Sequence, residues 1–217
     1  CKLISIFVGV TRQSRMKLLD VDFDLPNSPV GVLCSGGADS SLILYLLMKY
    51  SNQPIHILTM ANRRKHFTNA IVASKVIDWC TKQTLNNNII HTVQYVDKQT
   101  DEQLQQLTVK YLKVFKQIYI GDTCYPPDEI NQMFSKDTGD YFTLLEDRKP
   151  NKDRPTKAGP IYVPFTNHDK RKIAELYRHL DIMELASITR SCETFEDIGT
   201  EHCGNCWWCK EREWAFA

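Results

Sequence analysis

The connection between two apolar runs near residue 35 constrains the fold more than any other feature of this chain. The first run, Pro29–Cys34, is followed directly by Ser-Gly-Gly-Ala-Asp-Ser-Ser at residues 35–41, and a second apolar run starts at Leu42. The first run predicts a buried strand, and the second predicts a helix over 39–50. A strand that passes through a tight turn of small residues directly into a helix favours an α/β fold.

The turn itself has the composition of an anion-binding loop. It would aim several backbone N–H groups and the positive end of a helix dipole at one point, an arrangement that binds phosphate. Gly36 and Gly37 let the main chain approach an anion closely, and Asp39 can hold a magnesium ion that neutralises phosphate charge. The alternative is an ordinary strand–turn–helix connection, which the lack of bulky side chains disfavours. The predicted phosphate-binding residues are Ser35, Gly36, Gly37, Ala38, Asp39, Ser40 and Ser41.

Strand and helix patterns alternate along the chain and predict a twisted parallel sheet with helices on both faces, as in Rossmann-like folds. In such sheets ligands bind beyond the carboxyl ends of the strands, where residues 35–41 lie. We expect further strands at 54–60, 88–95 and 117–120, and helices at 67–83, 101–116 and 169–180.

The chain divides into three parts by composition. We expect an α/β domain at 28–190, a hairpin-like N-terminal extension at 1–27 and a cysteine-rich tail at 191–217. The charged stretch 136–160 is rich in Asp, Lys, Arg, Pro and Gly. It is expected to form a mobile loop, either a lid over the substrate or a solvated insertion without a role.

Composition disfavours several classes of partner. The net charge of +1 gives no overall field to attract nucleic acid, and no apolar run approaches the roughly 18 residues that span a bilayer. Four of the eight cysteines lie in the last 26 residues, a distribution that favours a metal site in a reducing compartment. We therefore expect a cytoplasmic protein that acts on a small molecule.

The clustered cysteines have the spacing of a zinc site. Cys203, Cys206 and Cys209 form two overlapping Cys-x-x-Cys units, and Cys192 lies upstream. Such a unit lets two thiolates reach one tetrahedral ion, and four thiolates with no open position make a structural site. The metal would anchor a tail too short for its own core. A redox dithiol, buried cysteines without a metal, an iron–sulfur cluster, and His202 in place of one thiolate stay open as alternatives.

The turn at 35–41 resembles the pyrophosphate loop of the N-type ATP pyrophosphatases, whose signature is Ser-Gly-Gly-x-Asp-Ser. Together with the C-terminal cysteines, the pattern resembles the 7-cyano-7-deazaguanine synthase family. The family's Val-Pro-Gly-Arg-Asn segment is absent. Further segments similar to that family are Arg64-Lys65-His66, Tyr119-Ile120-Gly121, Val163-Pro164-Phe165 with Lys170, Thr189-Arg190-Ser191-Cys192, and Arg212.

This resemblance implies an ATP-dependent ligase. ATP would adenylate the carboxylate of 7-carboxy-7-deazaguanine, ammonia would displace AMP to give an amide, and a second ATP would drive formation of the nitrile, a step of queuosine biosynthesis. The implied cofactors are ATP, Mg²⁺ and Zn²⁺. The implied catalytic residues are Asp39, Lys170 and Arg64, with Lys170 stabilising charge in the transition state.

Some of these residues have plainer alternatives. Lys170 could be an exposed lysine at a helix start, and Arg64 a surface arginine. Asp122, just past the fourth strand, is a candidate for contact with substrate or magnesium, or else an ordinary turn aspartate.

Three other functions stay open. An asparagine-synthetase-like amidotransferase suits the residues from Gly31 to Ser41 but does not explain the four C-terminal cysteines. A tRNA-thiolating enzyme would want a basic surface, which the near-neutral charge disfavours. A nucleotide-binding module without turnover could use the aromatic tail (Trp207, Trp208, Trp214 and Phe216) to dock a partner, whereas in an enzyme these side chains would pack the thiol site against the domain. A homodimer is open as well.

Overall fold

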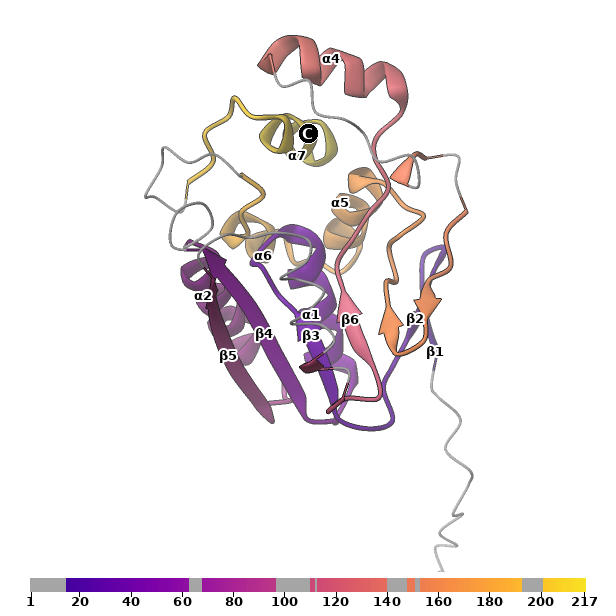
Figure 1. Ribbon diagram of the computed structural model, residues 1–217, viewed down its shortest axis with the longest axis vertical. Coiled ribbons are helices and arrows are strands. Elements are labelled where there is room, and N and C mark those ends of the chain that lie inside the picture. The colour runs from indigo at the N-terminus through magenta and orange to yellow at the C-terminus, as the bar shows by residue number, and fades with distance from the viewer. Residues whose placement is uncertain are drawn as a thin grey trace, which may run out of the picture.

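A mostly parallel β-sheet organises the molecule (Figure 1). The computed structural model describes residues 15–62, 68–96, 110–111, 113–139, 148–150, 153–192 and 201–217. Within these residues the sheet has six strands in the order β5-β4-β3-β6-β8-β7, and β1 and β2 form a separate two-stranded sheet. Neighbouring strands of the larger sheet are parallel except β7 and β8, which form an antiparallel pair.

The strands are β1 (Arg15–Leu18), β2 (Val21–Asp24), β3 (Val30–Leu33), β4 (Ile55–Asn62), β5 (Ile89–Val96), β6 (Ile118–Ile120), β7 (Lys157–Ala158) and β8 (Ile161–Tyr162). The helices are α1 (Ala38–Tyr50), α2 (Thr68–Gln83), α4 (Asp128–Thr138), α5 (Lys170–His179), α6 (Met183–Ile188) and α7 (Trp207–Phe216).

The elements predicted before Gly121 are confirmed to within two residues wherever the structure describes them. The exception is the helix expected at 101–116, most of which lies outside the described residues; residues 110–111 are helical. The hairpin-like extension is confirmed for residues 15–24, where β1 and β2 pair antiparallel. Residues 1–14 lie outside the described part.

The prediction for 136–160 was wrong in part. Residues 136–138 end α4, and Lys157–Ala158 form β7. Helix α4 follows two prolines, carries Asp128 and Glu129 in its first turn, and ends at Gly139 in the left-handed conformation. Proline before a helix, acidic residues at its start and glycine after its end are regular helix signals, which the charge of the stretch obscured.

The order of the strands places the turn at 35–41 at a switch point. From β3 the chain moves outward to β4 and then β5, and later returns to β6 on the other side of β3. Helices that leave neighbouring strands in opposite directions open a crevice at the carboxyl ends of those strands. Here the crevice lies between β3 and β6.

One large apolar core holds the sheet and four of its helices together. Val30, Val32 and Ile57 of the sheet contribute to this core with α1, α2, α5 and α6. Helix α1 is buried along almost its whole length because it lies among the sheet, α2 and α5. On a second cluster, Tyr111 and Phe115 pack against Leu58, Met60 and Ile118. The sequence predicts helices on both faces of the sheet. Four helices contribute to the first cluster, and in the second cluster the structure describes only residues 110–111 as helical.

The aromatic tail folds back onto the molecule. Trp207 at the start of α7 is 1% exposed and packs edge-on against Tyr125 and Phe134. Figure 1 shows α7 and α4 together at the top of the view, and α7 also contacts α5. This position favours the packing role over the docking role for Trp207. No helix in the described part of the chain is long and apolar enough to cross a membrane.

Candidate functional site

The loop after β3 presents an open helix N-terminus. Helix α1 begins at Ala38 with Gly37 as its N-cap residue, and no side chain caps it. The Ser41 N–H donates to the Gly37 carbonyl at 3.0 Å, which is the first bond of the helix. The N–H groups before it have no partner within the helix, and Gly37, Ala38 and Asp39 of this turn line a cavity at the positive end of the helix dipole. This is the geometry of an anion site.

Two glycines allow the loop to pack this closely. Gly36 has φ +82°, and a Cβ there would lie 2.7 Å from Val72 Cγ1. Gly121, at the end of β6, lies so close to α1 that a Cβ would be 2.5 Å from the Ser40 backbone nitrogen. The carboxyl ends of β3 and β6 therefore meet directly at the first turn of α1. A larger residue at either glycine would push the loop out of place.

A cavity of about 380 Å³ lies beyond this loop. The loop forms one wall, and Lys170 from the start of α5 enters from a second. Tyr125, Trp207 and Trp208 supply an aromatic wall that comes from the loop after β6 and from α7. The cavity is large enough for part of a nucleotide and a small substrate, since ligand pockets are typically about 300–1,000 Å³.

Lys170 and Asp39 form a buried ion pair in this cavity. Lys170 Nζ lies 2.5 Å from Asp39 Oδ2 and 3.9 Å from Glu211 Oε2, and the lysine is only 6% exposed. Burial by itself lowers the pKa of Lys170, but the charges of Asp39 and Glu211 outweigh it and raise that pKa. The ammonium is thus held in its charged form. The alternative of an exposed helix-start lysine was wrong, because Asp169 caps α5 and turns the next side chain inward.

Two buried polar atoms of the loop lack partners. Within the described residues, Asp39 Oδ1 and Ser41 Oγ accept and donate no hydrogen bond. Buried polar groups are nearly always satisfied, so such atoms need an explanation. A carboxylate oxygen with an unused lone pair beside a helix N-terminus fits a magnesium–phosphate group, with oxygen the ligand that magnesium prefers.

Arg148 reaches the cavity from the charged stretch, and Arg154 of the same stretch lies behind it, paired with Asp122. Asp122 pairs with both, Oδ1 with Arg148 Nη2 and Oδ2 with Arg154 Nη1, each at 3.0 Å. Arg148 also donates to the Thr123 carbonyl and stacks over the Tyr125 ring. Asp122 thus positions a guanidinium at the cavity wall and is not left open for a metal.

Arg190 is a further buried cation of the cavity wall. Its backbone N–H donates to the Gly36 carbonyl at 3.0 Å. Its guanidinium donates to Thr68 Oγ1 at 2.8 Å and to the Glu201 carbonyl at 3.0 Å, and Nη2 has no partner in the described part of the chain. Arg190 therefore ties the segment before Cys192 to the phosphate loop.

The four clustered cysteines come together as the sequence predicts. The sulfur atoms of Cys192, Cys203, Cys206 and Cys209 all lie within 4.8 Å of one another. The Cys203–Cys209 and Cys192–Cys206 sulfurs are 3.8 and 3.9 Å apart. A tetrahedral ion with bonds of about 2.3 Å would place its sulfur ligands about 3.8 Å apart. The thiols fit zinc, and His202 lies beside them, with Nδ1 3.8 Å from Cys209 Sγ.

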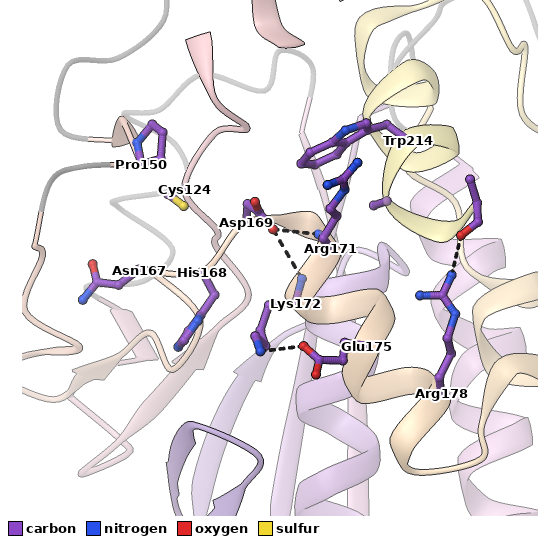
Figure 2. A pocket seen from close by; sticks show the side chains of 12 residues that line it. Cys124, Pro150, Asn167, His168, Asp169, Arg171, Lys172, Glu175, Arg178 and Trp214 are labelled. Atoms are coloured by element: carbon purple, nitrogen blue, oxygen red, sulfur yellow. Dashed lines mark hydrogen bonds and ion pairs between the residues drawn. The ribbon is translucent and has the colours of Figure 1, made fainter. Parts of the chain in front are cut away.

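A second depression, of about 610 Å³, lies on the outer side of α5 and away from the phosphate loop. Figure 2 shows that its charged side chains are engaged with one another or with the backbone: Lys172 with Glu175, and Arg178 with the last carbonyls of the chain. Arg171 stacks over Trp214. Neither residues 35–41 nor the clustered thiols line this depression. We therefore take the smaller cavity, which both of them border, as the candidate functional site.

Most of the predicted site residues meet at one place. Ser35, Gly37, Ala38, Asp39 and Lys170 line the same cavity, as does Cys192, whereas Gly36, Ser40 and Ser41 belong to the loop without lining the cavity. Arg64 lies outside the described residues. Sequence reasoning missed Glu211, Arg148 and the part played by Arg190. Nothing in the local sequence marks them, because three different segments bring them to the loop.

The fold and the cavity define an α/β protein with a loop of anion-site geometry at the switch point of its sheet and a thiol cluster beside it. The model of the asparagine synthase family matches residues 26–113, less than half of the 217 residues. The matched segment contains β3, the phosphate loop and α1. It supports the superfamily of N-type ATP pyrophosphatases as the relatives of this chain.

Two synthetases are among the solved structures to which this chain is similar. One is NMN synthetase from Francisella tularensis, with a TM-score of 0.43 and 17% identity over 70% of this chain and 61% of that one. Another is NH3-dependent NAD synthetase from Campylobacter jejuni, in complex with nitrate, with a TM-score of 0.43 and 15% identity over 72% and 65%. The chain spans less than two thirds of the length of either. No significant match was found among curated proteins.

Proposed function

We propose that this chain is an ATP pyrophosphatase-type ligase. It would adenylate a carboxylate oxygen of a small molecule, and ammonia would then displace AMP to give an amide. The observation that carries the proposal is the meeting of an open helix N-terminus, the carboxylate of Asp39 and the buried ammonium of Lys170 in one cavity. In the proposed reaction the helix N-terminus would bind pyrophosphate, Asp39 would bind magnesium, and Lys170 would stabilise the transition state. The asparagine synthase match over the loop supports the same chemistry.

The loop would hold the pyrophosphate part of ATP. The N–H groups at the start of α1 and the hydroxyl of Ser35, which lines the cavity, can donate to phosphate oxygens. Ser40 Oγ lies 3.4 Å from Ser35 Oγ and donates to the Gly37 carbonyl, so it would support the loop. A magnesium ion held by Asp39 would neutralise phosphate charge. Lys170 would stabilise the charge that develops as an acid oxygen attacks the α-phosphorus and pyrophosphate leaves.

The second half of the reaction needs a nucleophile and a dry site. Ammonia attacks the adenylated carbon and AMP leaves with the bond electrons, so the product is an amide. Trp207, Trp208 and Tyr125 wall the cavity opposite the loop and would exclude water from the adenylate. We propose 7-carboxy-7-deazaguanine as the acid, with a second adenylation of the amide oxygen giving the nitrile. The four thiols would hold zinc and anchor α7.

The test is an incubation with ATP, magnesium, ammonium and 7-carboxy-7-deazaguanine, followed by measurement of AMP, pyrophosphate and nitrile. We expect two AMP per nitrile. AMP without nitrile would keep the ligase chemistry and discard this substrate. Aspartate, run as a second acid, tests the asparagine-synthetase-like alternative. ATP binding without AMP from any acid would leave a nucleotide-binding module.

A further inference from the structure

In the proposed function Lys170 and a magnesium ion would share the same carboxylate, that of Asp39. The lysine ammonium is buried and lies 2.5 Å from Asp39 Oδ2. A buried ammonium without a counter-charge is strongly unfavourable. If Asp39 binds a magnesium–nucleotide complex, the magnesium ion neutralises part of the carboxylate charge, and that charge no longer balances Lys170. Another carboxylate must then hold the lysine in place.

Glu211 is the carboxylate in position to do so. It lies on α7, its side chain is 5% exposed, and its Oε2 is 3.9 Å from Lys170 Nζ. In the described part of the chain, Lys170 is the only cation with which it forms an ion pair. At 3.9 Å the contact is looser than that of Asp39, so a small movement of the flexible lysine would exchange one partner for the other.

The backbone at Glu211 is fixed on both sides. Cys209 belongs to the thiol cluster two residues earlier. Arg212, the next residue, donates to Thr189 Oγ1 at 2.9 Å and to the Ala186 carbonyl. The carboxylate is therefore presented to the cavity by a segment that cannot drift.

We propose that Glu211 is a positioning residue that takes over Lys170 when Asp39 engages the magnesium–nucleotide complex. It keeps the lysine charged, buried and free to face the phosphate. The tail that the thiols anchor then contributes the Glu211 carboxylate to the cavity in addition to the aromatic side chains of its wall. This inference rests on the proposed function, because it assumes that Asp39 binds the metal with ATP.

The test compares Glu211→Gln with Glu213→Gln, an exposed residue of the same helix that pairs with Lys210. Binding of ATP is measured by calorimetry over a range of magnesium concentrations, and AMP formation is measured in parallel. In E211Q, Lys170 has Asp39 alone, so the metal must compete with the lysine. We expect the half-saturating magnesium concentration to rise about tenfold, with kcat at saturating magnesium within about threefold of the parent. E213Q should match the parent, and Glu211→Asp should restore part of the loss.

A second comparison separates positioning from direct metal binding. In a Lys170→Met background there is no ammonium to hold, so adding E211Q should leave the magnesium dependence of ATP binding unchanged. An additional loss in that background would make Glu211 a metal ligand and overturn the inference. An unchanged magnesium dependence in E211Q alone, at equal melting temperature and metal content, would overturn it too while the proposed function stands. Parent protein that binds no ATP would remove both.

Discussion

At the scale of single residues, the site depends on one buried cation between two carboxylates. Lys170 is close to both Asp39 and Glu211 and is shielded from water. Its removal would leave two buried acids close to each other without a counter-charge. The lysine thus contributes to stability as well as to the proposed chemistry.

Lys170→Met should therefore reduce AMP formation by about 100-fold or more, because a preorganised charge at the reacting phosphate is lost. Lys172→Met is the matched control. It lies on the outer side of α5, where it pairs with Glu175 (Figure 2) and with Asp20, and its loss should change the free energy of unfolding by only about 0.5 kcal/mol. Equal AMP formation by the two variants would show that the buried lysine has no role in turnover.

Gly121 tests the close approach of β6 to the loop. A methyl group there would meet the Ser40 backbone nitrogen at 2.5 Å, and backbone cannot yield as a side chain can. We expect Gly121→Ala to cost about 1–3 kcal/mol of unfolding free energy and to weaken ATP binding, since α1 must move. Denaturant unfolding and calorimetry check both. A variant as stable as the parent, with normal binding, would mean that the loop tolerates displacement.

At the scale of elements, the β1–β2 hairpin is joined to the sheet through Asp24. Tyr119 Oη donates to the Asp24 carbonyl at 2.6 Å, and the Asp24 N–H donates to Tyr162 Oη at 3.0 Å. The Asp24 carboxylate pairs with Lys157 of β7 at 2.5 Å and with Arg15 of β1 at 3.0 Å. One residue therefore links the hairpin to β6, β7 and β8.

This arrangement predicts a dependence of stability on pH. Burial raises the pKa of Asp24, but hydrogen bonds from Lys157 and Arg15 outweigh it, so the pKa in the folded protein is lowered. The folded state therefore binds the proton less readily than the unfolded chain, and the stabilisation is complete above the carboxyl's ordinary pKa. It is lost as the pH falls through the lowered value. Urea unfolding should show Asp24→Asn less stable than the parent at neutral pH, with the difference shrinking on acidification. A difference that grows in acid would contradict this.

The elements also show what could be predicted from sequence. The change from continuous apolar runs to helical spacing placed β3, β4, β5 and β6 and the described helices between them. The signal is strongest for β3, which is buried on both faces, and the apolar run also placed β5, although that edge strand has no buried residue. Helix α7 left no such pattern, since Cys209 occupies a buried position that a core helix would give to an aliphatic residue, and Cys206 directly precedes the helix. The pair Lys170–Asp39 was expected in one site but not in contact. Glu211 and Arg148 depend on packing between segments far apart in the chain, which no local signal encodes.

At the scale of the whole molecule, the thiol cluster and the phosphate loop are parts of one structure. Cys192 follows Arg190, which bonds to Gly36, and α7 carries Trp207 and Glu211 to the cavity. Loosening the tail would therefore open the wall of the cavity opposite the loop. Stability and ligand binding should respond together when the metal is removed.

We expect the purified protein to contain about one zinc ion per chain, and a strong chelator or Cys206→Ser to release it. Without the metal, α7 should loosen and Trp207, now 1% exposed, should meet water. Tryptophan emission should then shift to longer wavelength, and ATP affinity should fall about tenfold or more because the cavity loses a wall and Glu211. Cys124→Ser is the control, a buried thiol in the outer depression shown in Figure 2, and should keep its zinc and its affinity. If metal loss leaves both emission and ATP affinity unchanged, the tail does not support the cavity. A brown protein that contains iron would show that the thiols hold an iron–sulfur cluster and not zinc.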